Sequence, residues 1–259
     1  MQCLTPEFFR KVNVDWLSQV YVVVNPNLSD LITMRIIRPK SSSLSLCDLV
    51  AEGEGLHTEF KRLINSAPKI ARSLSAFANT AGGTILVGVD DDKRVVGIRS
   101  EKETLQIIDE ALRFHIEPKP EIELYVEVFK SRMVLVVVIP ESPERPHFHI
   151  EERYRYETGK PVVARRVFIR EGSQNRAASE ERIALMLAST EPVKLSFSER
   201  EQRLLAYLSE HGRITTEEFA RLAAIPLQEA RRILVLLVRA GTIQLLTEET
   251  SCCYTLFAG

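Results

Sequence analysis

A glycine pair, Gly82-Gly83, separates two apolar segments of different periodicity and constrains the fold more than any other feature of the sequence. Before the pair, apolar side chains recur every three or four residues, which predicts a helix over residues 68–81. Two glycines are a typical helix end because glycine adopts left-handed backbone angles without steric cost. Residues 84–89 are apolar and β-branched but too few for a helix, which predicts a buried strand. Three aspartates, residues 90–92, would lie at the end of this strand as a candidate site.

Similar patterns predict the elements in the middle of the chain. Helical spacing marks helices, and alternation or β-branched content marks strands. The expected elements are short strands at residues 95–98 and 167–169, a hairpin of residues 122–128 and 133–139, and helices at residues 101–115 and 180–187.

Residues 141–163 are rich in proline, histidine and charge, which is typical of a loop. His147 and His149 lie within this segment and would share one face of an extended chain. No third metal ligand stands at a fixed spacing from them, so they are expected to be exposed loop residues rather than a zinc pair.

The C-terminal part changes to a helical pattern. Helices are expected at residues 199–210, 216–223 and 227–240, followed by strands at residues 243–246 and 254–257. This order is typical of winged helix-turn-helix domains. The third helix would present Gln228, Arg231 and Arg232 to bases or phosphates. Residues 196–259 carry seven Lys or Arg against eight Asp or Glu, a net of -1, so a winged helix used for protein contacts or dimerisation remains an alternative.

Four blocks of residues resemble the Schlafen-type AlbA-like domain, which is often described as a DNA-binding domain. The blocks are the Glu-x-x-x-x-Glu-Phe-Lys segment at residues 54–61, the Ala-Phe-Ala-Asn-Thr-x-Gly-Gly segment at residues 76–83, residues 88–97, and residues 167–179. The resemblance implies an α+β fold with a mixed sheet. Together with the C-terminal pattern it predicts three parts: an N-terminal extension at residues 1–43, an AlbA-like domain at residues 44–190 and a winged helix-turn-helix domain at residues 196–259.

The extension is the least legible part of the sequence. Residues 6–12 are compatible with a short helix, and residues 20–24 and 34–37 are apolar and partly β-branched. These segments could add strands to the domain that follows.

Three carboxylates, Glu54, Glu59 and Asp91, with Asp90 as an alternative to Asp91, form the only expected catalytic set. The resemblance implies that some Schlafen-family members hold a divalent metal with three such residues and cleave RNA. Carboxylate oxygens suit Mg²⁺ or Mn²⁺, which activate water and stabilise charge on a phosphate. In the alternative interpretation, Glu59 pairs with Lys61 on one strand face and the aspartates solvate a turn.

Lysine and arginine side chains near the four blocks could contact phosphates, the sequence-independent part of nucleic-acid affinity. The candidates are Lys61, Arg62, Lys69, Arg72, Arg165, Arg166, Arg170 and Arg176. Because glutamates are interspersed among them, a solvated mixture of charges is the alternative interpretation. Because the chain has a formal net charge of -1, any nucleic-acid contact must come from such a local patch.

Cysteine usage and hydropathy favour a cytoplasmic protein. The four cysteines show no Cys-x-x-Cys spacing, which disfavours a zinc site and a disulfide framework. No apolar run approaches the ~20 residues that span a bilayer, so no membrane association is expected.

The sequence therefore favours a nucleic-acid-binding protein, a DNA-binding transcriptional regulator that binds DNA rather than RNA and forms a homo-oligomer. No cofactor is expected for this function. One alternative is a metal-dependent endoribonuclease that uses Mg²⁺ or Mn²⁺. Another is a protein-interaction adaptor that dimerises through the winged helix.

Overall fold

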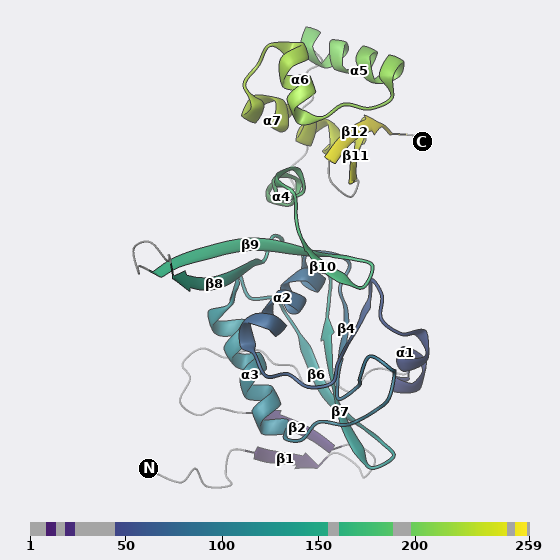
Figure 1. Cartoon of the computed structure of the whole chain (residues 1–259), viewed down its shortest axis with the longest axis vertical. Helices are drawn as coiled ribbons and strands as arrows, with labels where there is room; N and C mark the ends of the chain where they lie inside the picture. The colour runs from purple at the N-terminus through teal and green to yellow at the C-terminus, as the bar shows by residue number, and fades with distance from the viewer. Residues whose placement is uncertain are drawn as a thin grey trace. The chain divides into compact units, whose positions relative to one another are not determined.

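The computed structural model of this 259-residue chain describes residues 9–13, 19–23, 45–154, 161–188, 198–247 and 252–257. The chain divides into two compact units, Met1–Ala177 and Ala178–Gly259. Helices and strands occur in both units (Figure 1), so the protein has the expected α+β fold class.

The first unit contains two four-stranded sheets and three helices within its described residues. One sheet has the order β3-β4-β7-β6, with β3 parallel to β4 and the other pairs antiparallel. The second, antiparallel sheet has the order β10-β9-β8-β5, and β1 pairs with β2 separately. The elements in chain order are β1 Phe9–Asn13, β2 Gln19–Val23, α1 Leu46–Glu52, β3 Thr58–Lys61, α2 Ala67–Ala78, β4 Gly83–Val87, α3 Glu101–Phe114, β5 Ile116–Glu117, β6 Glu123–Phe129, β7 Arg132–Ile139, β8 Phe148–Tyr154, β9 Pro161–Glu171 and β10 Gln174–Ala177.

The glycine pair links α2 to β4 as the sequence predicts. Gly82 has a φ of 67°, and a Cβ there would lie 2.6 Å from the carbonyl oxygen of Ile139. A Cβ on Gly83 would lie 2.4 Å from the Phe77 ring. A larger residue at either position would force its surroundings to move. The two glycines therefore allow β4 to begin close to the end of α2.

Helices cover both faces of the first sheet. Ile85 and Val87 of β4 pack in a cluster with α2 and α3, whereas Leu86 packs in a second cluster with Leu46 of α1. Burial on both faces explains why β4 is continuously apolar rather than alternating.

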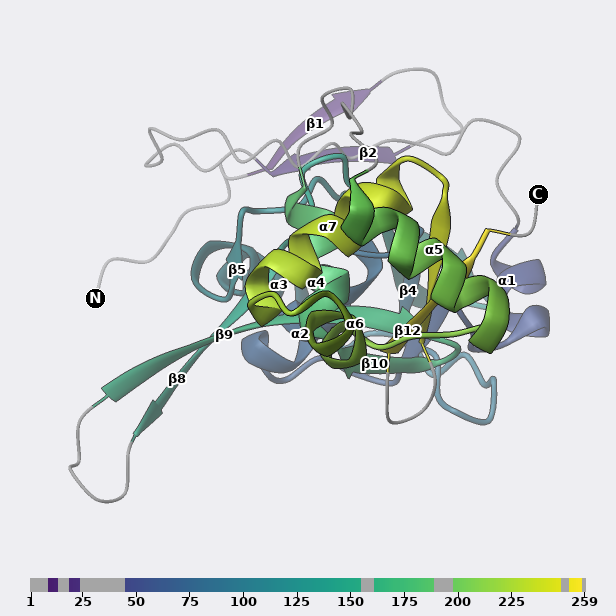
Figure 2. The same cartoon turned by 90° about the horizontal axis from the view of Figure 1, so that it is seen from above.

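The second sheet packs against α2 through side chains and hydrogen bonds. Asn79, at the end of α2, donates through Nδ2 to the carbonyl oxygens of His147 (2.9 Å) and Phe168 (3.0 Å). Its Oδ1 accepts from the backbone N–H of His147 at 2.7 Å. Helix α2 therefore touches both sheets, while Figure 2 shows the β8–β9 hairpin extending beyond the helices of its unit.

Three expectations about this unit are wrong. Residues 141–163 are not one loop, because they contain β8 and the start of β9, which pair over their full described length. Residues 9–13, expected to be partly helical, form β1. Residues 95–98 do not form a strand, and only Val95 makes an isolated bridge, to Val89. The expected strand at residues 34–37 lies outside the described residues.

The second unit contains the helices and the hairpin that the sequence predicts, in the predicted order. Its buried core includes Leu204, Phe219, Leu234 and Tyr254, and Tyr254 of β12 forms an isolated antiparallel bridge with Ile214. The elements are α4 Glu180–Leu187, α5 Glu199–His211, α6 Thr216–Ala223, α7 Leu227–Arg239, β11 Ile243–Thr247 and β12 Cys252–Leu256.

Helix α4 belongs to the second unit and packs against α7. A domain boundary at residue 190 would place it in the first unit instead. Among the described residues of both units, no helix has the length and apolar character needed to cross a membrane.

Candidate nucleic-acid interface

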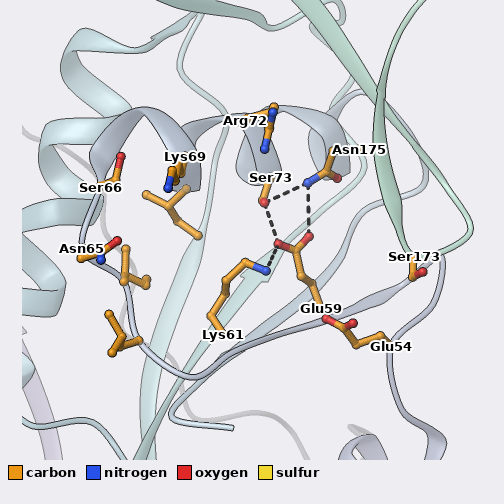
Figure 3. A pocket seen from close by; sticks show the side chains of 13 residues that line it. Glu54, Glu59, Lys61, Asn65, Ser66, Lys69, Arg72, Ser73, Ser173 and Asn175 are labelled. Atoms are coloured by element: carbon orange, nitrogen blue, oxygen red, sulfur yellow. Dashed lines mark hydrogen bonds and ion pairs between the residues drawn. The ribbon is translucent and has the colours of Figure 1, made fainter. Parts of the chain in front are cut away.

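A polar pocket of about 330 Å³ opens on the first unit beside β3. Strand β3, the chain that follows it, the first two turns of α2 and the β9–β10 turn supply its walls (Figure 3). The lining residues are Glu54, Glu59, Lys61, Leu63, Ile64, Asn65, Ser66, Lys69, Ile70, Arg72, Ser73, Ser173 and Asn175.

Glu59 is the centre of a hydrogen-bonded network on the pocket wall. Its Oε1 accepts from Ser73 Oγ (2.7 Å) and lies 2.8 Å from Lys61 Nζ. Its Oε2 accepts from Arg170 Nη1 (2.5 Å) and from Asn175 Nδ2 (3.4 Å). A carboxylate has about four acceptor sites, so Glu59 is fully engaged. The expected pair between Glu59 and Lys61 is confirmed.

Arg170 is a structural residue rather than an exposed phosphate contact. Its side chain is 0% exposed, and Nη2 donates to the carbonyl oxygens of Gly55 (2.7 Å) and Thr58 (3.3 Å). The guanidinium also lies 4.4 Å from the centroid of the Phe77 ring. Burial lowers the pKa of Arg170 below its ordinary value, and the charge of Glu59 opposes this shift.

A turn between the two glutamates brings them to the same pocket. The Gly55 N–H donates to the Thr58 carbonyl oxygen at 2.9 Å and closes this turn, and Gly53, directly before Glu54, has a φ of 88°. Glu54 then folds back, and its Oε1 accepts from the backbone N–H of Phe60 at 2.8 Å. Glu54 stays exposed while Glu59 is buried.

Asp91 is not brought to this pocket. It is exposed in the turn after β4, where Asp90 Oδ1 accepts from the Arg94 N–H (2.8 Å) and Asp92 pairs with Arg94 (2.9 Å). Within the described ranges, no group of three His, Cys, Asp or Glu side chains is arranged to hold a metal ion. The residues present therefore do not fit the expected Mg²⁺ or Mn²⁺ centre in this conformation.

Three basic residues line the pocket. Lys61 has a 39% exposed side chain, and Lys69 and Arg72 are also exposed. Lys69 has no ion-pair partner among the residues that the structure describes, whereas the Arg72 guanidinium lies 5.7 Å from the Phe168 ring. Arg62 is exposed outside the pocket lining.

The remaining basic candidates differ in how accessible they are. Arg176 is exposed and lies 3.5 Å from Glu171. On α7, Gln228 and Arg232 are exposed. The Arg231 side chain is only 20% exposed, because it pairs with Glu180 of α4 at 2.6 Å and approaches Glu181.

His147 and His149 are buried, contrary to the expectation that they are exposed loop residues. His147 Nδ1 lies 2.7 Å from the Pro118 carbonyl oxygen, and His149 Nε2 lies 2.8 Å from that of Pro68. Burial is the main cause that lowers the pKa of both rings. In the described structure His147 Nε2 has no hydrogen-bond partner, so a second proton there would be unsatisfied.

Ser73 and Asn175 are site residues that sequence reasoning missed. Ser73 donates to Glu59 and accepts from Asn175 Nδ2 at 2.9 Å. The sequence carries a signal for Ser73, because this serine interrupts the apolar face of α2. In the structure its exposed fraction is 2%. Asn175 lies in β10 opposite Arg170, but its surrounding sequence is typical of a turn, where asparagine is common, so no such signal distinguished it.

Comparisons with known proteins match part of this chain to one family. The family described as "Schlafen, AlbA_2" matches residues 54–179, which include both glutamates and Asn175. A Corynebacterium diphtheriae protein of known crystal structure is similar over 60% of this chain and 28% of its own, with 16% identity and a TM-score of 0.38. The N-terminal domain of a Nitrosomonas europaea protein named as related to the ATP-dependent DNA helicase RecG is similar over 53% of this chain and 96% of its own, with 24% identity and a TM-score of 0.37. Residues 54–179 of this chain therefore match the Schlafen AlbA_2 family.

Proposed function

We propose that this protein binds nucleic acid through its AlbA-like domain and acts as a DNA-binding transcriptional regulator. The observation that carries the proposal is the pocket edged by Lys61, Lys69 and Arg72. Lysine and arginine that neutralise phosphates supply most sequence-independent affinity for nucleic acid. The match of residues 54–179 to an AlbA-like family agrees with this function.

The local charge of the pocket supports the proposal although the whole chain is slightly acidic. Two carboxylates line the pocket, and the charge of Glu59 is balanced by the buried Arg170 behind it. Counting Arg170, four cations face two carboxylates, a local net of +2 against -1 for the chain. A phosphate at the edge of the pocket, beside Lys69 and Arg72, therefore meets a favourable local potential.

We also propose that the second unit is a winged helix-turn-helix domain and that the protein is a homo-oligomer. Three helices followed by a hairpin, with the bridge from Tyr254 to Ile214, support this interpretation. If α7 contacts DNA, Gln228 and Arg232 are the accessible residues for that contact, because Arg231 is engaged in an ion pair with Glu180. Symmetric pairing would place two such helices on one palindromic site.

Salt-dependent binding to a short labelled DNA duplex and to single strands tests the proposal by fluorescence anisotropy. We expect a double variant, Lys69→Gln with Arg72→Gln, to bind roughly tenfold more weakly and to lower the salt slope by about 2. The matched control removes one lysine and one arginine from α3, Lys102→Gln with Arg113→Gln, and should bind like the wild type. A wild-type protein that binds no nucleic acid refutes the function, and a stable dimer in that case would favour the adaptor.

A metal-dependent endoribonuclease is the second candidate function. One observation favours it: Glu54 and Glu59 line the same pocket as Lys61. Incubation of structured RNA and Mn²⁺ with the wild-type protein, and in parallel with the Glu54→Gln and Glu59→Gln variants, tests this candidate. Cleavage that both substitutions abolish would establish the nuclease, whereas intact RNA with the wild-type protein would refute it.

A further inference from the structure

The charges around the pocket are separated into an exposed basic edge and an acidic wall. Lys69 and Arg72 stand on the exposed surface of α2, while Glu54 and Glu59 come from the β3 side. Figure 3 shows Glu59, Lys61 and Ser73 directed toward one another, with Lys69 and Arg72 on the helix above them. A bare phosphate that entered the pocket would meet two carboxylates, so the anionic part of a ligand belongs at the edge.

The ligand part inside the pocket must be neutral and must donate hydrogen bonds. Both oxygens of Glu59 already accept from Ser73, Lys61, Arg170 and Asn175. Glu54 is exposed, and a carboxylate retains acceptor capacity after one bond from the Phe60 N–H. Glu54 is therefore the acceptor that an N–H group of a ligand would meet.

The pocket is preorganised and of suitable size for one nucleotide unit. Ser73 and Asn175 are held by 2.7 to 2.9 Å bonds, so little ordering is needed on binding. A volume of about 330 Å³ lies at the lower end of the range for small-molecule pockets. A paired base in a duplex cannot enter such a recess, whereas an unpaired base can.

We propose that this pocket takes one unpaired nucleotide of a single strand, with its phosphate on Lys69 and Arg72 and an amino group of its base on Glu54. This inference rests on the proposed nucleic-acid binding and adds selectivity for single strands and for bases with an exocyclic amine. Carboxylates accept from the cytosine N4 amine in the same way in other complexes. Thymine has a carbonyl oxygen at that position. Because this oxygen and the Glu54 carboxylate are both hydrogen-bond acceptors, no hydrogen bond would form between them.

Matched homopolymers test the proposal with the full-length protein. Labelled oligo-dC should bind about tenfold more tightly than oligo-dT of equal length, which is about 1.4 kcal/mol for one base contact. Oligo-dC should also bind more tightly than a duplex of the same length. Glu54→Gln, which keeps an acceptor oxygen for the Phe60 N–H, should reduce the dC preference to within about twofold while the salt slope stays unchanged.

The outcomes separate this inference from the proposed function. Salt-sensitive binding that is equal for duplex, dC and dT would overturn the inference and leave nucleic-acid binding in place. No binding to any of the three would overturn both. A dC preference that persists in Glu54→Gln would overturn the assigned contact, and the duplex comparison with wild-type protein does not depend on the variant.

Discussion

Replacing Arg170 by methionine should destabilise the first unit by about 3 to 5 kcal/mol, the usual cost of breaking a buried ion pair. Arg170 and Glu59 have side chains that are 0% and 5% exposed, so water cannot replace the lost guanidinium. Methionine keeps an apolar stem against the Phe77 ring, so the expected loss is polar rather than a cavity.

The magnitude can be assembled from the individual contacts. The carbonyl oxygens of Gly55 and Thr58 each lose a donor, which costs roughly 1 kcal/mol per bond. Glu59 keeps Lys61 and Ser73 but loses its closest cation, and a buried group that loses its partner costs about 1 to 3 kcal/mol. These contributions together reach the stated range, a large part of a typical total stability of 5 to 15 kcal/mol.

Urea unfolding followed by far-UV circular dichroism measures the change, and hydrogen exchange in residues 67–78 assigns it to the first unit. The matched control is Arg176→Met, which removes an exposed arginine with a 3.5 Å surface pair and should cost under about 0.5 kcal/mol. Adding Glu59→Gln to Arg170→Met should recover part of the loss, because the uncompensated charge is removed. Equal effects of Arg170→Met and Arg176→Met would refute the reasoning.

Three further predictions concern other polar side chains that hold elements together. The pKa values of His147 and His149 are lowered in the fold, so the unfolded chain binds protons first as the pH falls below about 6.5. The free energy of unfolding should therefore drop by up to roughly 1.4 kcal/mol per pH unit per ring until the folded pKa is reached. A melting temperature that stays constant from pH 7 to pH 5 would contradict this. Asn79→Ala leaves three buried backbone groups unpaired and should cost about 2 to 4 kcal/mol in urea unfolding, whereas a loss below 1 kcal/mol would show that water replaces the amide. Arg231→Met should loosen α4, seen as faster hydrogen exchange in that helix while α5 is unchanged, because the arginine joins α7 to Glu180; unaltered exchange would mean that apolar packing alone holds α4.

The elements that the sequence predicts correctly are those whose burial leaves a local pattern, either a fixed period or, for β4, a continuous apolar run. Helix α2 buries one broad face, and β6 and β7 turn at Lys130 and Ser131, which both have positive φ. Strand β8 was missed because charged residues follow its apolar start, and its order comes from pairing with β9. Pairing between strands depends on tertiary structure, so the composition of a segment alone does not predict it.

The site was partly predictable for the same reason. Local sequence identified Glu54, Glu59 and Lys61, which lie close together in the chain and meet in the pocket. The partner that fixes Glu59, Arg170, is 111 residues away, so a pattern of letters could not distinguish a buried structural arginine from a phosphate contact. Asp91 shows the converse, since a carboxylate near a strand end need not point into the site.

Glu59 and Glu54 differ in their capacity to bind a ligand, because the acceptor sites of Glu59 are already occupied. A carboxylate held by Arg170, Lys61, Ser73 and Asn175 would have to break those bonds before it could bind an ion. Glu54 accepts a backbone N–H at 2.8 Å and is exposed, so it can meet a ligand without that cost. Recognition by Glu54 beside a basic edge therefore needs no rearrangement of the fold, whereas metal chemistry at this pocket needs Glu59 to be released and a third ligand to arrive. The structure thus favours binding over cleavage.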